Sequence, residues 1–242
     1  DDDALFLRLF ELLERLENPH KKLRFIHVAG SNGKGSTCSM LESALRQAGY
    51  RTGLYTSPHL MSFCERFQVN GEWIRPDALA SITEQVREQA EQMADHPSQF
   101  EISTAIAMLY FLSEQCEIVI LEVGMGGELD STNVIPAPEV AVITNITPNH
   151  LNWHTDMAEY VAAKTRIFKR SATRLVTNAD CAITRELAAE CDLPVTLFGV
   201  GVADTEWARA ALALSGDTVV IRTERGVTHL SLAGQFHLPG KH

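Results

Sequence analysis

The apolar residues of this chain fall into two kinds of pattern. Residues 25–28 (FIHV), 117–123 (EIVILEV) and 140–144 (VAVIT) are short, continuous apolar runs rich in β-branched residues, as is typical of buried strands. Apolar residues instead recur at helical spacing over residues 5–16 and over residues 40–48, where Gly49 ends the run. The chain is therefore predicted to alternate strands and helices.

The rest of the chain continues this alternation. The two-residue turn Asn70-Gly71 predicts a hairpin over residues 67–74. Further helices are predicted at residues 76–93, 103–115, 157–169 and 181–191, and further strands at residues 52–55, 174–177 and 195–198. Residues 206–232 predict short antiparallel strands, with turns at Gly216-Asp217 and near Gly226. We expect one α/β domain over residues 1–242, with a mainly parallel sheet flanked by helices and an antiparallel β edge near the C-terminus.

A glycine-rich loop lies between the first strand and the helix that follows it, in HVAGSNGKGSTCSM (residues 27–40). The order strand, loop, helix points backbone amides and the positive end of a helix dipole at one spot. Lys34 adds a mobile positive charge, and Ser36 adds a hydroxyl within reach of a magnesium ion. This chemistry suits phosphate binding.

The loop departs from the standard phosphate-binding pattern at two positions. Val28 stands where that pattern has its first glycine, and Gly35 stands where it has Ser or Thr after the lysine. A tight turn that carries a solvated lysine therefore stays open as an alternative.

Composition excludes several classes of protein. The chain has 242 residues, 45% hydrophobic residues and a mean hydropathy of −0.05, as soluble globular proteins do. Its net charge of −10 disfavours sequence-independent nucleic-acid binding. No apolar run approaches the roughly 20 residues of a membrane span, and the acidic start DDDALFLRLF does not resemble a secretory signal. The five cysteines show no zinc or redox spacing, which favours free thiols in a reducing cytoplasm.

Ligands of parallel sheets bind beyond the carboxyl ends of the strands, and polar residues follow several predicted strands here. The strand at residues 52–55 ends at Thr56–His59, the strand at 117–123 carries Glu122, and the strand at 140–144 is followed by Asn145 and His150. With the glycine loop, these groups predict a magnesium–nucleotide site. Each alone has an ordinary alternative: a carboxylate with a structural partner, or a solvated histidine.

Four blocks of sequence carry a family resemblance. GSNGKGS at 30–36, YTSPHL at 55–60, ERFQVNGEWI at 65–74 and LEVGMGGELDSTNVI at 121–135 together resemble folylpolyglutamate synthase/dihydrofolate synthase, of the Mur ligase superfamily of ADP-forming amide ligases. This likeness covers roughly residues 1–145.

After residue 144 the likeness changes. NITPNHLNWHTDMAEYVAAKTRIF at 145–168, VTNADC at 176–181 and LPGKH at 238–242 look more like the D-glutamate-adding ligase of peptidoglycan synthesis. The chain is thus either a divergent natural member or a fusion of two relatives with a junction near residues 136–146.

The resemblance implies roles for individual residues. Lys34, Lys164 and His150 would be catalytic, with Lys164 carrying a carbamate that holds a second magnesium ion. The other implied groups are the ATP-binding loop (Gly30, Ser31, Asn32, Gly33, Lys34, Gly35, Ser36), the magnesium ligands (Ser36, Ser57, Glu122, His150 and the Lys164 carbamate) and the substrate residues (Ser57, Pro58, His59, Glu65). From spacing alone, Lys164 is equally a surface lysine of a helix.

Two positions depart from the folate family. Glu128 stands where the family usually has arginine, and Asn149 precedes His150 where it has aspartate. Both departures bear on the substrate more than on the nucleotide.

Three functions stay open. The chain is an ATP- and Mg²⁺-dependent ligase of the folate type, a ligase acting on a muramyl peptide, or a nucleotide-binding module without ligase activity. By resemblance, a C-terminal domain that binds the incoming amino acid would follow LPGKH, so we expect no complete ligation from this chain alone. We expect a cytoplasmic monomer that acts on small molecules, with no nucleic-acid or membrane partner.

Overall fold

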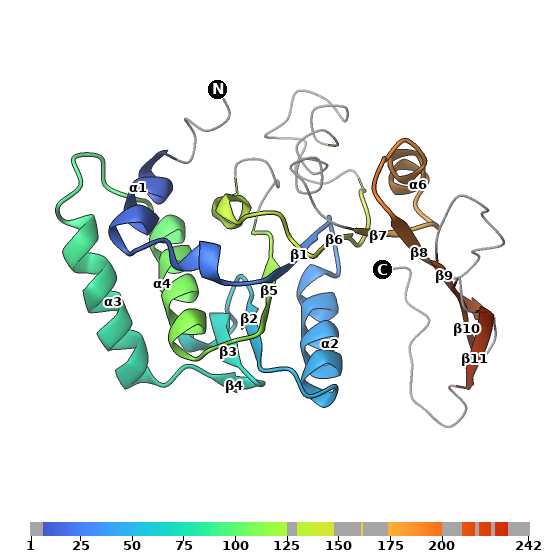
Figure 1. Cartoon of the computed structure of the whole chain (residues 1–242), viewed down its shortest axis with the longest axis horizontal. Helices are drawn as coiled ribbons and strands as arrows, with labels where there is room; N and C mark the ends of the chain where they lie inside the picture. The colour runs from blue at the N-terminus through green and yellow to red at the C-terminus, as the bar shows by residue number, and fades with distance from the viewer. Residues whose placement is uncertain are drawn as a thin grey trace.

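The structure is a computed structural model that describes residues 7–124, 130–147, 161, 174–199, 210–215, 218–223 and 226–231 (Figure 1). Within these residues one eleven-stranded sheet has the order β11-β10-β9-β8-β7-β6-β1-β5-β2-β3-β4. The strands are β1 (Phe25–Ala29), β2 (Thr52–Tyr55), β3 (Phe67–Val69), β4 (Glu72–Trp73), β5 (Ile118–Glu122), β6 (Val140–Ile143), β7 (Leu175–Asn178), β8 (Val195–Gly199), β9 (Ala210–Ser215), β10 (Thr218–Thr223) and β11 (Gly226–Ser231).

The centre of this sheet is parallel, as predicted. Every neighbouring pair from β2 through β5, β1, β6, β7 and β8 to β9 runs parallel. Antiparallel pairs lie at both edges, β2–β3–β4 at one and β9–β10–β11 at the other. The predicted α/β fold is thereby confirmed, with one difference: the sequence predicts β9 as antiparallel to its neighbours, but β9 extends the parallel run through its pairing with β8.

The helices among the described residues connect these strands. They are α1 (Leu7–Arg15), α2 (Lys34–Gln47), α3 (Pro76–Ala90), α4 (Gln99–Ser113) and α6 (Ala182–Ala189), with short 3-10 helices η2 (Pro19–Lys22), η3 (Phe63–Arg66) and η4 (Ser131–Val134). None of the helices in these described segments is long and apolar enough to cross a membrane.

Helix α4 begins four residues before its predicted start at Ser103. Ser98 and Glu101 form a capping box: the Glu101 amide donates to Ser98 Oγ, and the Ser98 amide donates to Glu101 Oε2 at 2.6 Å. This pair satisfies two amides of the first turn that have no partner within the helix. The spacing Ser-x-x-Glu therefore sets the start of α4, ahead of its apolar stretch.

Helices cover both faces of the central strands (Figure 1). Cys38 and Leu41 of α2 pack on one face, whereas α1, α3 and α4 pack on the other, around Phe25 and Tyr55. Successive side chains of a strand point to opposite faces, so strands covered twice must be apolar throughout. This is why β1 and β5, each with all five residues buried, are apolar at every position except His27 and Glu122.

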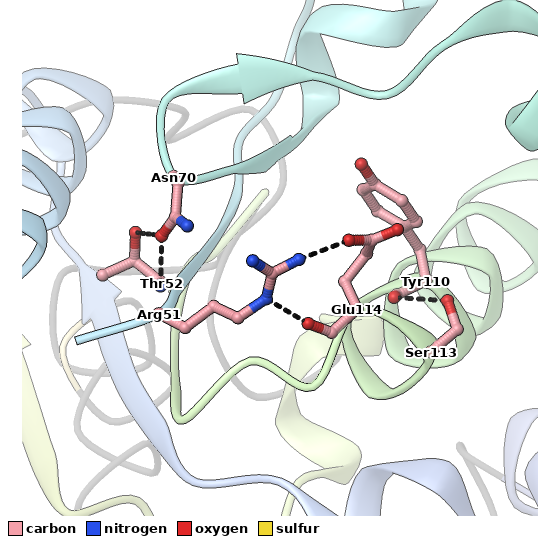
Figure 2. Close-up of polar contacts among 6 residues, drawn as sticks. All are labelled: Arg51, Thr52, Asn70, Tyr110, Ser113 and Glu114. Carbon is pink, nitrogen blue, oxygen red and sulfur yellow. Dashed lines mark hydrogen bonds and ion pairs between the residues drawn. The ribbon is translucent and has the colours of Figure 1, made fainter.

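The amino end of β2 is tied to the end of α4 and to the β3–β4 hairpin (Figure 2). The Arg51 guanidinium donates to the backbone carbonyl and the carboxylate of Glu114. The backbone amide of Thr52 donates to Asn70 Oδ1 at 2.9 Å. These contacts lie at the opposite end of the sheet from the carboxyl ends of the parallel strands.

The strand order sets the position of a ligand site. β1 lies between β5 and β6. The strand that follows β1 in the sequence, β2, lies on the β5 side of β1, whereas the strand that follows β5, β6, lies on the opposite side of β1. Such a reversal of strand order opens a crevice beyond the carboxyl ends of the strands. The glycine loop follows β1 at this point.

Candidate functional site

The glycine loop joins β1 to α2 across residues 30–33. Gly30 has φ +146° and Gly33 has φ +77°, both in the region that favours glycine. Gly33 is the N-cap of α2, which begins with no side-chain cap. The first turn of α2 therefore presents backbone amides and the positive end of its dipole to the solvent, which is the arrangement that binds phosphate.

A close approach to β6 requires a glycine at position 30. A Cβ atom on Gly30 would lie 1.9 Å from Thr144 Oγ1. The Thr144 amide also donates to the Ala29 carbonyl at 3.0 Å. The loop thus lies directly against the carboxyl end of β6.

Lys34 and Glu122 bring opposite charges to the loop. Lys34 Nζ donates to the Gly30 carbonyl at 3.3 Å, which keeps the ammonium beside the loop. Glu122, at the end of β5, accepts a hydrogen bond from the Ser57 amide through Oε2 at 3.0 Å. A Cβ on Gly35 would lie 3.4 Å from Glu122 Oε2, so the carboxylate packs against the first turn of α2.

The environment of Glu122 perturbs its proton affinity. Burial raises the pKa of its carboxyl, and the nearby Asp130 carboxylate raises that pKa further. The Ser57 and Gly35 amides and the Lys34 ammonium act in the opposite direction but do not cancel the effect of burial. A buried carboxylate with a raised pKa beside a glycine loop of this kind is the sort of group found at functional sites.

The loop after β2 carries the residues predicted to contact substrate. Ser57 and Pro58 are joined by a cis peptide bond. His59 accepts a hydrogen bond at Nδ1 from Arg66 Nε at 3.1 Å and meets the edge of Phe63, with ring centroids 5.7 Å apart.

Glu65 stabilises the same loop through hydrogen bonds to its backbone. Its carboxylate accepts the backbone amides of Leu60 at 2.8 Å, Met61 at 2.8 Å and Ser62 at 2.7 Å. These hydrogen bonds lower the pKa of Glu65, the Leu60 amide having the largest effect. Leu60 and Met61 are each 91% exposed. Glu65 thus shapes the loop, and its contact with substrate stays a prediction.

A buried polar chain beside the site was not predicted from the sequence. Asp130 Oδ1 accepts both the amide and the hydroxyl of Thr132, at 3.0 and 2.6 Å. Thr132 Oγ1 is also 2.8 Å from His27 Nε2. A threonine hydroxyl has one proton, so with Asp130 ionised His27 must be the donor to Thr132. Asp130 and Thr132 belong to the GGELDSTN segment. The polar residues of this segment, which follows a buried strand, were the one sign in the sequence that it could contribute to the site.

Some predicted residues are not placed by the structure. His150 and Lys164 lie outside the described residues, as do Glu128 and Asn149. The structure therefore brings together the loop from Gly30 to Ser36 with Ser57 and Glu122. The role of every proposed magnesium ligand, placed or not, stays a prediction. Across the described segments, no group of three or more His, Cys, Asp or Glu side chains is placed to hold a metal.

Comparison with known families supports this assignment of the fold. The family profile of the Mur ligase middle domain matches residues 28–240, from β1 to beyond β11. The chain therefore belongs to the Mur ligase middle-domain family.

Its relatives include folate enzymes. The chain is 41% identical over 162 residues to a dihydrofolate synthase/folylpolyglutamate synthase of Bacillus subtilis, covering 65% of this chain and 37% of that protein. It is 36% identical over 187 residues to the enzyme of the same name from Escherichia coli, covering 75% of this chain and 44% of that protein.

Solved structures of folate enzymes resemble the fold of this chain. E. coli FolC in complex with ADP superposes with a TM-score of 0.77 at 30% identity, over 92% of this chain and 52% of that chain. A complex of FPGS with AMPPCP and folate gives a TM-score of 0.75 at 32% identity, over 91% of this chain and 55% of that chain. The chain thus spans about half the length of these structures.

Proposed function

We propose that this chain is the nucleotide-binding part of an ATP-dependent amide ligase of the folylpolyglutamate/dihydrofolate synthase type. The observation that carries the proposal is the glycine loop at the carboxyl end of β1, with Lys34 inside it and Glu122 of β5 against α2. The relatives named above bear folate synthase names, and two of the superposed structures hold ADP or AMPPCP.

The proposed chemistry proceeds through an acyl phosphate. A carboxylate of the substrate attacks the γ-phosphate of ATP, forming the acyl phosphate and releasing ADP. The amine of the incoming amino acid then displaces phosphate to give the amide. The loop amides and Lys34 hold the phosphates and offset the negative charge that develops on the transferring phosphoryl group.

The oxygen groups of the site fit a magnesium ion. Mg²⁺ prefers oxygen ligands and usually keeps several waters beside one or two carboxylates and the substrate phosphates. Glu122 supplies a buried carboxylate, and Ser36 or Ser57 supplies a hydroxyl. His150 and a carbamate on Lys164 complete the proposed ligand set. When bound, the ion would neutralise phosphate charge.

The substrate is proposed to be a pterin or folate, held by Ser57, Pro58, His59 and Glu65, with glutamate as the incoming amino acid. The support is that the relatives bear folate synthase names and that Glu65 accepts three backbone amides of the loop after β2. A monomer in the cytoplasm, where ATP and reduced folates are available, completes this proposal.

A muramyl-peptide acceptor is the second candidate. It rests on the segment NITPNHLNWHTDMAEYVAAKTRIF at 145–168, which looks more like the D-glutamate-adding ligase. A fusion of two relatives near residues 136–146 would account for both likenesses. A nucleotide-binding module without ligase activity is the third candidate.

Nucleotide binding is the first test. Calorimetric titration of the chain with ATP and ADP, with and without Mg²⁺, should show saturable binding that Mg²⁺ strengthens. Absence of binding by a folded chain would refute the proposal.

The acceptor is tested by ADP release. The chain is incubated with ATP, Mg²⁺ and L- or D-glutamate, together with dihydropteroate, a reduced folate or the muramyl-alanine nucleotide. Stimulation by a folate acceptor supports the first candidate, and stimulation by the muramyl nucleotide supports the second. Binding of ATP without any stimulated ADP release would favour the module.

A further inference from the structure

Asn145 and Asn32 form a reciprocal hydrogen-bonded pair although they are 113 residues apart in the sequence. The Asn32 amide donates to Asn145 Oδ1 at 3.0 Å, and Asn145 Nδ2 donates to the Asn32 carbonyl at 3.0 Å. The side-chain amide of Asn145 therefore satisfies both the N–H and the carbonyl of Asn32, as the backbone of a neighbouring strand would.

The contacts around this pair reinforce it. Thr144 Oγ1 donates to the same Asn32 carbonyl at 2.7 Å, so that both lone pairs of this oxygen are engaged. The Ser31 amide donates to the Asn145 carbonyl at 2.9 Å, and Ser31 Oγ both donates to and accepts from the backbone of Thr147. The loop is thus bound to residues 144–147 along its length.

These contacts fix the direction of a peptide plane. In a trans peptide the carbonyl and the following amide point in opposite directions. The Asn32 carbonyl faces Thr144 and Asn145, so the Gly33 amide must point away from β6. Gly33 is exposed at the N-cap of α2, where phosphate is expected.

We propose that Asn145 is a positioning residue that sets the phosphate-binding conformation of the glycine loop. Its side chain orients the Asn32–Gly33 peptide so that the Gly33 amide donates to a phosphate oxygen of the nucleotide. This role rests on the proposed nucleotide binding, but the orientation of the loop can be measured without nucleotide. Because the loop is fixed in the free protein, binding avoids the cost of ordering it.

The test compares Asn145→Ala and Asn145→Asp with the unmodified chain. Asn145→Ala removes both hydrogen bonds. Asn145→Asp keeps the acceptor for the Asn32 amide but replaces the donor with an oxygen that repels the Asn32 carbonyl. Both variants are expected to bind Mg-ATP and Mg-ADP at least about tenfold more weakly by calorimetry, a difference of about 1.4 kcal/mol.

Thr177→Val is the matched control. The Thr177 hydroxyl is fully buried and donates to the Ile143 carbonyl at 3.2 Å. It comes from β7, on the side of β6 opposite to β1, whereas the glycine loop follows β1. This variant should lower the thermal midpoint while leaving the nucleotide affinity within about twofold. Equal weakening of ATP binding in Thr177→Val and Asn145→Ala would show a general effect of stability and would overturn the proposal.

Thr144 offers a second pair of variants. Thr144→Ser keeps the hydroxyl donor to the Asn32 carbonyl, whereas Thr144→Val removes it. Weaker ATP binding in Thr144→Val, restored in Thr144→Ser, would support the proposal. Unchanged binding in both variants would contradict the role given to the Asn32 carbonyl.

Hydrogen exchange separates this inference from the function it rests on. In the nucleotide-free chain, the Asn32 amide should exchange faster in Asn145→Ala than in the unmodified protein or Thr177→Val. Unchanged exchange at Asn32 would overturn the positioning role. Failure of the unmodified chain to bind nucleotide would instead refute the proposed function.

Discussion

Glu122 Oε2 accepts a hydrogen bond from the backbone amide of Ser57 at 3.0 Å, which joins the carboxyl end of β5 to the loop that follows β2. The predicted magnesium ligand and the predicted substrate loop are therefore in direct contact. Any change at Glu122 acts on both, and a suitable substitution can separate the two effects.

Glu122→Gln should retain the acceptor for the Ser57 amide and lose the negative charge. We expect the protein to stay folded while the gain in ATP affinity from Mg²⁺ falls at least about tenfold, because the ion prefers a carboxylate oxygen. Glu122→Ala also leaves the Ser57 amide without its hydrogen-bond acceptor, which costs about 1–3 kcal/mol of folding stability. Calorimetry and thermal unfolding measure the two effects. An undiminished Mg²⁺ dependence in Glu122→Gln would exclude Glu122 as a ligand.

The two loop glycines should differ in their tolerance of alanine. Gly33 has φ +77°, and a Cβ at this position would meet open space, so Gly33→Ala should cost only the strain of that conformation, about 1–2 kcal/mol. Gly30→Ala adds a collision with Thr144 Oγ1, and we expect about 2–5 kcal/mol in total. Chemical denaturation gives both values. Equal costs would mean that Gly30 does not approach β6 as described.

Lys34→Ala should weaken ATP binding about 10- to 100-fold with little effect on folding. The reason is that the Lys34 ammonium makes one loop hydrogen bond and otherwise offers its charge to the phosphates. Lys22→Ala is the control, since it removes an equal charge from η2, before the amino end of β1. A similar loss in both variants, measured by calorimetry, would indicate a long-range effect of net charge.

Two buried histidines should make the protein sensitive to acid. Burial lowers the pKa of His20 to about 4 and that of His27 to about 3, from 6.5. Below pH 6.5 the unfolded chain therefore binds protons that the folded chain does not, so stability falls as the pH falls toward 4. The expected slope is roughly 1 kcal/mol per pH unit for each imidazole.

Substitution isolates the contribution of each histidine to this slope. Urea unfolding between pH 7 and pH 4 should give a shallower dependence for His27→Gln and for His20→Gln than for the unmodified chain. If the slope stayed the same in both variants, acid sensitivity would have to come from other groups.

Glu65→Gln should loosen the loop that carries Leu60 and Met61. The carboxylate accepts three backbone amides, and a carboxamide offers only one acceptor oxygen. Hydrogen exchange at residues 60–62 should accelerate. Since the pKa of Glu65 is lowered in the folded state, the same acceleration should appear in the unmodified protein as the pH falls below about 4.5 and through the lowered pKa.

The control for this experiment is Glu72→Gln on the exposed strand β4. It should leave exchange at residues 60–62 unchanged. Protection that persists in Glu65→Gln would show that other contacts hold the loop.

The sequence predicts the central strands well because of how they are buried. β1, β5 and β6 are short strands whose residues are almost all buried. The ends of their apolar runs in the sequence therefore lie within one residue of the ends of the strands. The predicted start of α4 is four residues late, because its capping box at Ser98 and Glu101 precedes the apolar stretch.

The glycine loop and Glu122 were predictable because a strand end and its polar residue are adjacent in the sequence. Asn145 and Ser57 were also expected near them, since each follows a predicted strand, but the individual hydrogen bonds were not predicted. Thr144 and Asn145 meet the loop across 112–113 residues, and Thr132 meets His27 across 105 residues. These residues come together only because β1 pairs with both β5 and β6. Local patterns of hydropathy do not predict which strands pair.

The dependence of the glycine loop on residues 144–147 has a consequence for folding. Closing a chain segment of more than 100 residues carries an entropic cost that local hairpins avoid, and such pairings form slowly. A refolding chain should therefore acquire its β3–β4 hairpin and its helices before it can hold a phosphate group. Competence to bind nucleotide would then report the assembly of the sheet through β6, so a nascent chain that has not yet added this strand would contain the whole glycine loop without its binding conformation.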